Sequence, residues 1–271
     1  EVETIKRGLQ QHIVGKKITK VKIRDPRLRW PVDAEKVIAA VIGNKLLEVK
    51  RKAKYLLLYL QNHHVLIIHL GMSGRILLFD TNSVLHKHDH AIFHFADGTQ
   101  MRFRDPRRFG MIDTCAITEL ADYPRFQHLG FEPLDVNLSG EILHKRAGRT
   151  TKPVKNILMD GHFIVGVGNI YANEALFQAG LHPLAPSHHL TENDWQHLLA
   201  KVQSVLQAAI EKGGTTLNDF VNSSGEAGYF QLSLSVYGRE GAQCKRCDAV
   251  VKRIALVGRS TFFCPNCQPV L

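Results

Sequence analysis

The sequence CKRC at residues 244–247, followed by CPNC at residues 264–267, decides the architecture of the C-terminal part of this chain. Each CxxC pair lets a tight turn aim two thiolates at one point, and two such turns supply the four soft ligands of a closed tetrahedral site. Disulfides or a thioredoxin-like redox centre are the alternatives, but we find neither a secretory leader nor a surrounding βαβ pattern. We therefore predict one structural Zn²⁺ held by Cys244, Cys247, Cys264 and Cys267.

The residues between the two cysteine pairs predict a two-stranded hairpin. Apolar runs at residues 249–251 and 254–257 precede a turn at Gly258–Arg259, and Thr261–Phe263 follows it. A hairpin this short cannot bury a core by itself. We therefore expect the metal ion to supply stability that a core would otherwise provide.

The charge of the chain favours a polyanionic partner. The sequence holds 35 Lys and Arg against 25 Asp and Glu, a net charge of +10. The basic residues are interleaved with aromatic and amide residues and do not lie on one amphipathic helix, so nucleic acid fits better than a membrane surface. A basic protein without a nucleic-acid partner is the alternative that composition alone leaves open.

Length and composition predict a protein of about two domains with no membrane span. The chain has 271 residues and 44% hydrophobic content, enough for a sizeable core at roughly 100 to 200 residues per domain. The longest apolar run, Val65–Ile68, is far shorter than the roughly 20 residues of a membrane helix. An unpaired Cys115 beside four metal-type cysteines favours a reducing cytoplasm.

The predicted secondary structure changes from strands to helices near residue 135. Residues 16–114 read mostly as strands with turn signals such as Asp97–Gly98, which predicts an antiparallel sandwich or barrel. Helices fit residues 2–12 and 33–42. From residue 139 to 212 the pattern is helical, with Thr191 as the N-cap of one helix. The polar segment 213–231 is too long for a simple connection and predicts a functional lid.

Residues 165–171, VGVGNIY, open a helix in the second half. Two glycines let the backbone approach a ligand, and the N–H groups at a helix start favour an anion such as phosphate. A dinucleotide-binding fold does not fit, because the third glycine of its motif and a parallel βαβ unit are both missing. We interpret the segment as a helical element that grips a DNA backbone.

The chain resembles bacterial formamidopyrimidine-DNA glycosylases in blocks that run in order along its length. They are EVETIKRGL (1–9), RLRWP (27–31), KRKAKYLLL (50–58), HLGMSGR (69–75), KHDH (87–90), DPRRFG (105–110), LMDGHFIVGVGNIYANEALF (158–177), GGTTLNDF (213–220), VYGR (236–239) and the two CxxC pairs. The resemblance implies a base-excision repair enzyme that excises 8-oxoguanine and formamidopyrimidines from damaged double-stranded DNA. It would then cut the strand by β,δ-elimination.

The fold that the resemblance implies is a multidomain α+β chain. We expect an N-terminal antiparallel β-sandwich at residues 1–134 and a helix-two-turns-helix DNA-binding domain at residues 135–231. That second domain would carry a lesion-recognition loop at 213–231, and a zinc-bound β-hairpin would follow at residues 232–271. We expect the protein to be a cytoplasmic monomer.

Members of the resembled family begin with Pro-Glu-Leu-Pro, ahead of the residues that match Glu1–Glu3. The N-terminal proline amine forms a Schiff base with the sugar, and the adjacent carboxylate handles protons. We expect these residues to precede Glu1. If they did not, DNA binding would remain while the lyase chemistry was lost.

The resemblance also assigns roles to single residues. Lys54, which we place in a strand, would contact the lesion phosphate and assist base removal, and Arg259 at the hairpin turn would assist elimination. Other groups would contact DNA, chiefly its phosphates: His69, His88, Arg149, Lys152, Asn169 and Tyr237.

The resemblance also implies a wedge that fills the space left in the stack by an everted base, formed by Met72, Arg107 and Phe109. The Arg107 guanidinium would pair with the cytosine that has lost its partner. The structural alternatives are core packing for Met72 and Phe109 and a salt bridge to Asp105 for Arg107. For Glu174 two interpretations are equally open: it supports residues that contact the DNA, or it lies on a solvated helix face.

Three other functions stay open at this point. A catalytically silent damage-binding protein would follow if the chain truly started at Glu1. A zinc-ribbon regulator would bind undamaged duplex by sequence, but no recognition-helix pattern is present. An endonuclease VIII-like glycosylase for oxidised pyrimidines is the enzymatic alternative; the wedge residues and the 213–231 segment favour the purine enzyme.

Overall fold

The computed structural model describes residues 2–148, 150–212 and 234–270. The described residues form two compact units, one made of residues 2–127 with Lys212 and the other of residues 128–148, 150–211 and 234–270. The expected lesion-recognition loop at 213–231 and Arg149 lie outside the described residues. In the part of the chain that is described, no helix is long and apolar enough to cross a membrane.

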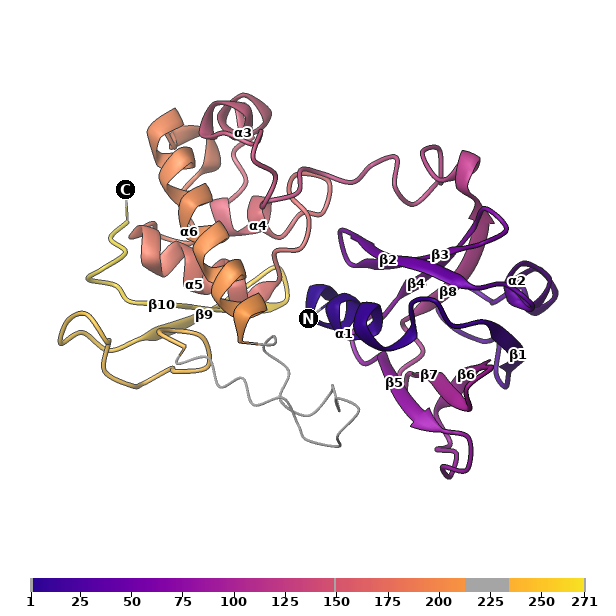
Figure 1. Cartoon of the computed structure of the whole chain (residues 1–271). Helices are drawn as coiled ribbons and strands as arrows, with labels where there is room; N and C mark the ends of the chain where they lie inside the picture. Colours follow the sequence, from indigo (N-terminus) through magenta and orange to yellow (C-terminus); the bar gives the residue numbers. More distant parts are fainter. Residues whose placement is uncertain (1, 149, 213–233, 271) are drawn as a thin grey trace. The chain divides into compact units, whose positions relative to one another are not determined.

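The first unit contains two four-stranded antiparallel sheets, which confirms the predicted sandwich class (Figure 1). The first sheet has the order β2-β3-β4-β8, with strands β2 (Leu46–Lys52), β3 (Tyr55–Leu60), β4 (His64–His69) and β8 (Met111–Ala116). The second has the order β1-β6-β7-β5, with strands β1 (Ile18–Ile23), β6 (Asp89–Phe95), β7 (Thr99–Arg104) and β5 (Arg75–Asp80). Neighbouring strands in each sheet pair antiparallel.

Both sheets and two helices contribute to one apolar core. Helix α1 (Val2–Ile13) buries Ile5, Leu9 and Ile13, which recur at the spacing of one helical face. Each such side chain stabilises the fold by roughly 1.5–3 kcal/mol relative to an exposed one. Helix α2 (Ala34–Val41) begins where predicted, since the Asp33 carboxylate accepts a hydrogen bond from the Lys36 N–H at 3.0 Å.

The second unit is helical, as the sequence predicts. Its helices are α3 (Gly140–Ala147), α4 (Val154–Leu158), α5 (Asn169–Ala179) and α6 (Glu192–Glu211), and 3₁₀ turns occupy Ser187–His189 here and Ile117–Glu119 in the first unit. Thr191 caps α6 by accepting from the Asp194 N–H at 3.2 Å. The apolar face of α6 is buried as expected: Trp195, Leu198, Leu199, Val202 and Leu206.

The hairpin between the two cysteine pairs consists of β9 (Lys252–Leu256) and β10 (Arg259–Phe263). The predicted turn at Gly258–Arg259 is wrong by one residue, because Arg259 pairs with Leu256 and already belongs to β10. The turn is Val257–Gly258, and both residues have positive φ, +47° and +69°. Two consecutive positive φ values are the signature of the type I′ turn that suits the twist of a hairpin. Residues 249–251 precede the first strand and are not part of it.

Valine is a poor residue for this turn, because a β-branched side chain rarely adopts positive φ. Val257 is 79% exposed, so its side chain contributes little packing in return. We expect Val257→Asn to stabilise the hairpin by about 1 kcal/mol, since Asn-Gly is the preferred type I′ pair. Thermal unfolding of the zinc-loaded protein measures this change. Gly258→Val is the control and should destabilise; a Val257→Asn variant less stable than the original protein would contradict the strain argument.

Candidate nucleic-acid interface and metal centre

The four cysteines of the hairpin fit a tetrahedral metal ion. Their sulfur atoms all lie within 4.8 Å of one another, with Sγ–Sγ distances of 3.5 Å for Cys247–Cys264, 3.6 Å for Cys247–Cys267 and 3.9 Å for Cys244–Cys267. Zinc–sulfur bonds of about 2.3 Å at tetrahedral angles require about 3.8 Å between sulfurs. All four positions are therefore taken by protein, which makes the zinc structural.

Polar side chains of the helices hold strand β10 in place. The Asn169 amide donates to the Ser260 carbonyl at 3.0 Å, and the Asn173 amide oxygen accepts from the Phe262 N–H at 2.7 Å. Both asparagines come from α5, which begins where the VGVGNIY segment predicts. Because an amide has two N–H groups, Asn169 retains one for a further partner. The metal and α5 together thus determine where Arg259 begins its strand.

Lys155 is a functional candidate that sequence reasoning passed over in favour of Lys152. Lys152 is exposed, whereas Lys155 is 1% exposed and donates to the Thr261 hydroxyl at 2.6 Å and the Ser260 carbonyl at 3.3 Å. Burial, and then the charge of Arg259, lower the pKa of Lys155 to about 8. The available signal was a lysine flanked by Val154 and Ile157 on a short apolar helix. The structure brings Lys155, Asn169 and β10 together.

Glu174 does not lie on a solvated helix face, and that interpretation was wrong. It is 4% exposed, and its carboxylate accepts from the backbone N–H groups of Ser235, Val236 and Tyr237 at 2.8–2.9 Å. The Tyr237 ring packs edge-on against Phe262 of the hairpin at 5.1 Å. Glu174 therefore positions Tyr237, one of the predicted DNA contacts.

In the first unit, Lys54 lies in the turn between β2 and β3 rather than in a strand, which corrects the sequence prediction. The preceding Ala53 has a φ of +53°, and its carbonyl accepts from the Arg51 guanidinium at 2.9 Å. Arg51 is held in turn by Glu3 of α1 at 3.0 Å. In this turn Ala53 is buried, whereas Lys54 is exposed.

His69, at the end of β4, is neutral at physiological pH. Burial, then the charges of Lys54, Arg29 and Arg125, lower its pKa to about 4. Its Nδ1 accepts from the Gly71 N–H at 3.0 Å, so the ring proton resides on Nε2. His69 can therefore donate one hydrogen bond through Nε2 without carrying charge.

The three wedge candidates are exposed on two adjoining loops. Met72 is 66% and Phe109 40% exposed, so core packing is wrong for both. The Arg107 guanidinium lies over the Phe109 ring at 4.7 Å and makes no salt bridge to Asp105 among the described residues. A large apolar pair beside a stacked cation, all facing solvent, is suited to contact stacked bases.

Asp105 supports these loops from beneath. It is fully buried, and its carboxylate accepts from the Ser73 hydroxyl at 2.6 Å and from the N–H groups of Arg107 and Gly110 at 3.3 and 2.8 Å. The loops approach so closely that a Cβ on Gly71 would meet the Phe109 carbonyl carbon at 2.5 Å. Glycine is thus required at position 71, where the loop that carries Met72 passes the loop that carries Phe109.

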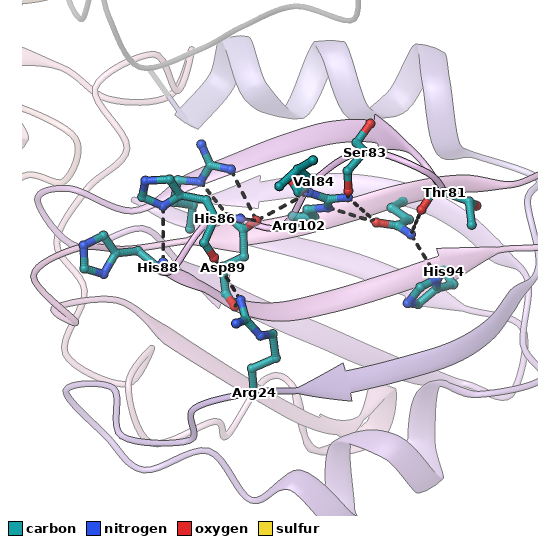
Figure 2. Close-up of polar contacts among 11 residues, drawn as sticks. Arg24, Thr81, Ser83, Val84, His86, His88, Asp89, His94 and Arg102 are labelled. Atoms are coloured by element: carbon teal, nitrogen blue, oxygen red, sulfur yellow. Dashed lines mark hydrogen bonds and ion pairs between the residues drawn. The ribbon is translucent and has the colours of Figure 1, made fainter.

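The His88 loop is held by a buried ionic network that Figure 2 shows. Arg102 and Asp89 are both fully buried; Arg102 donates to the Ser83 and Val84 carbonyls at 2.7 and 2.9 Å, and Asp89 accepts from the His86 N–H at 2.9 Å. Arg104 completes the network with a 2.6 Å ion pair to Asp89. The His88 ring points away from this network, so the loop presents it outward (Figure 2).

Comparison with known proteins covers the whole chain. Three family models match: Formamidopyrimidine-DNA glycosylase N-terminal domain at residues 1–112, Formamidopyrimidine-DNA glycosylase H2TH domain at 129–221, and Zinc finger found in FPG and IleRS at 243–270. The formamidopyrimidine-DNA glycosylase of Acidithiobacillus ferrooxidans is 44% identical over 99% of this chain and 98% of the relative, and that of Hahella chejuensis is 45% identical with the same coverage. The chain belongs to the formamidopyrimidine-DNA glycosylase family.

Solved members of the family share the fold. The Lactococcus lactis enzyme in complex with DNA that contains an abasic site has a TM-score of 0.91 and 31% identity, over 99% of this chain and 98% of that one. Its complex with Fapy-dG DNA gives a TM-score of 0.90 at the same identity and coverage. Membership of the formamidopyrimidine-DNA glycosylase family thus rests on sequence and on backbone geometry independently.

In this member of the family, Asp89→Asn should destabilise the first unit, because it leaves Arg102 buried without its charge partner. The expected loss is about 3–5 kcal/mol, a fall in Tm on the order of 10 °C. Burial alone would raise the pKa of Asp89, but Arg104 and the His86 N–H hold that pKa below its ordinary value. The contribution of this carboxylate therefore exists above about pH 4 and is lost as pH falls through its folded pKa.

Thermal melts between pH 3 and 8 measure this loss, and Asp80→Asn, at the exposed end of β5, is the matched control. The Asp89→Asn variant should also bind duplex DNA more weakly, since the loop that carries His88 loses its support. Unchanged stability of the Asp89→Asn variant would show that the network carries little of the fold.

Proposed function

We propose that this chain is a bifunctional DNA glycosylase and AP lyase of base-excision repair that removes 8-oxoguanine and formamidopyrimidines from duplex DNA. The observation that carries this proposal is the exposed set of Met72, Arg107 and Phe109 on loops that the buried Asp105 supports. An enzyme that works on a base must take it out of the stack, and the space left behind needs a filler. A zinc-ribbon regulator that reads undamaged duplex does not require such a wedge. The relatives named above do not favour an endonuclease VIII-like activity.

The phosphates beside the lesion would be gripped by groups that need little reorganisation. His69 offers a neutral Nε2–H, and Lys54 offers a charge from a turn that Arg51 holds. In the second unit, Lys155, Asn169 and Arg259 gather at the start of β10. His88, Lys152, Arg149 and Tyr237 would add contacts to the DNA. Donors that are already oriented bind phosphate at a lower entropic cost.

The covalent chemistry would follow the resembled family. An N-terminal proline amine attacks the sugar C1′, and the base leaves with a proton. The C1′–O4′ bond of the sugar then breaks, O4′ takes up a proton, and the nitrogen lone pair forms the iminium that links enzyme and sugar. Loss of the C2′ proton then expels the 3′ phosphate, and loss of the C4′ proton in the second elimination expels the 5′ phosphate. Arg259 stays charged throughout and would stabilise the leaving phosphate through two hydrogen bonds. Zinc, when bound, supplies no chemistry beyond holding the four thiolates together.

The finer organisation is also part of this proposal. We propose domains at residues 1–134, 135–231 and 232–271, which the three family matches at 1–112, 129–221 and 243–270 support. We further propose a monomer that works on chromosomal DNA in the bacterial cytoplasm. The net charge of +10 supports that location, because it favours a polyanionic partner.

Borohydride trapping tests the function directly. The enzyme with its natural amino terminus is incubated with duplexes that contain 8-oxoguanine, formamidopyrimidine or thymine glycol. We expect nicking and a covalent adduct with the two purine lesions, and much slower reaction with the oxidised pyrimidine. Preference for thymine glycol would replace the proposal with the endonuclease VIII-like activity, and binding without excision would leave a damage-binding protein.

Arg107→Ala should weaken discrimination among the bases opposite the lesion more than it weakens binding overall. A guanidinium that reads a base edge contributes about 1–3 kcal/mol of discrimination, or roughly 5- to 150-fold. Single-turnover excision opposite each of the four bases measures this ratio. Asn169→Ala is the comparison variant and should lower affinity uniformly, since its proposed partner is a phosphate. Equal losses opposite every base in the Arg107→Ala variant would exclude the base-reading role.

A further inference from the structure

Two arginines in the first unit stack on one tryptophan. The Arg29 guanidinium carbon lies 4.6 Å from the centroid of the Trp30 ring, and the Arg125 guanidinium carbon lies 3.9 Å from it. The two arginines come from segments nearly one hundred residues apart in the chain. Arg29 is exposed, while Trp30 and Arg125 are half-buried.

No carboxylate neutralises this pair within the described residues. Asp25, four residues before Arg29, is bound by Arg27 and Arg108. Asp113 is bound by Lys36 and by the Tyr123 hydroxyl at 2.7 Å. Two like charges that share one ring repel each other, and a bound anion would relieve that repulsion. The fold thus holds two cations together where no acid of the described chain neutralises them.

The stack is continuous with the proposed phosphate contact at His69. The charges of Arg29 and Arg125 reach His69, where they add to burial and Lys54 in keeping its ring neutral. A row of aromatic rings begins at Phe126, the residue after Arg125, and ends at His69: Phe126 packs edge-on against Tyr55 at 5.1 Å, and Tyr55 packs against His69 at 4.7 Å. Lys52 lies over the outer end of this row, 4.9 Å from the Phe126 ring.

We propose that Arg29, Trp30 and Arg125, together with Lys52, form a second binding site for backbone phosphates of DNA, beyond those that flank the lesion. The proposal rests on the proposed function, since it extends the same DNA-binding surface. Stacking on Trp30 fixes the plane of each guanidinium while leaving N–H groups at its edge available, and such groups match the oxygens of a phosphate. Held in this way, each arginine loses less side-chain entropy when the phosphate binds.

The salt dependence of binding tests this site. Fluorescence anisotropy gives the Kd of the full-length zinc-loaded protein for a duplex of about 25 base pairs with a stable abasic-site analogue, over a series of salt concentrations. Each phosphate contact contributes about 0.9 to the slope of log K against log salt. For the double variant R29A/R125A we expect the slope to fall by about 1.8 and the affinity at low salt to fall at least tenfold.

The control is K20A/K22A, which removes the same net charge from two exposed residues of β1. Trp30→Leu keeps both arginines but removes their platform, so we expect a measurable loss of affinity at a retained Tm. A slope and Kd for R29A/R125A equal to those of the unchanged protein, or equal losses in K20A/K22A, would overturn the proposal. An acidic protein segment as the true occupant would give the first of these results.

The same titration on undamaged duplex separates this inference from the proposed function. Phosphate contacts are independent of the lesion, so the variant should lose slope on both duplexes. If the unchanged protein failed to excise any oxidised base, the proposed function would fall, while the slope on undamaged duplex would still decide whether the arginine pair binds phosphate.

Discussion

Four thiolates brought within 4.8 Å of one another are the constraint on which the basic surface of the second unit depends. The hairpin they close is too short to fold on its own burial. Once closed, it presents the Ser260 carbonyl to two donors, Asn169 and Lys155, and its Phe262 N–H to Asn173. The metal therefore acts on function only through geometry, because the positions of Arg259 and of the Lys155 amine both follow from where β10 lies.

Buried carboxylates hold the loops in place, as the metal site holds the hairpin. Asp105, Asp89 and Glu174 are each buried, and each accepts from backbone N–H groups of a segment that belongs to no strand or helix. A buried charge is tolerated only when its hydrogen-bonding capacity is filled, so the loop cannot move without leaving that charge unsatisfied. This explains how irregular segments hold Phe109, His88 and Tyr237 in defined positions without a regular hydrogen-bonded ladder.

Local sequence patterns were enough for the elements but not for the site. Strand-like segments separated by turn signals predicted the sandwich, the Asp33 and Thr191 caps started their helices, and the CxxC pairs predicted the metal site. The errors fall where long-range contacts decide. Lys54 leaves the strand because Arg51 and Glu3 hold a turn, and Lys155 is buried because β10, over one hundred residues later, receives its amine. No pattern within a window of neighbouring residues contains Glu3 beside Lys54 or Thr261 beside Lys155.

Whether an arginine is bound by a carboxylate or carbonyl, or only stacks on a ring, indicates its role better than the net charge of the chain does. Arg102 and Arg104 also lie near a ring, that of Phe79. Arg102 donates to the Ser83 and Val84 carbonyls and to Gln100, and Arg104 pairs with Asp89, so these N–H groups are already used within the protein. Arg107 stacks on Phe109 instead, and Arg29 and Arg125 stack on Trp30. A ring orients a guanidinium without neutralising it. The charge that remains is what a phosphate or a base edge requires, and this is the physical reason why we propose these three arginines as DNA contacts.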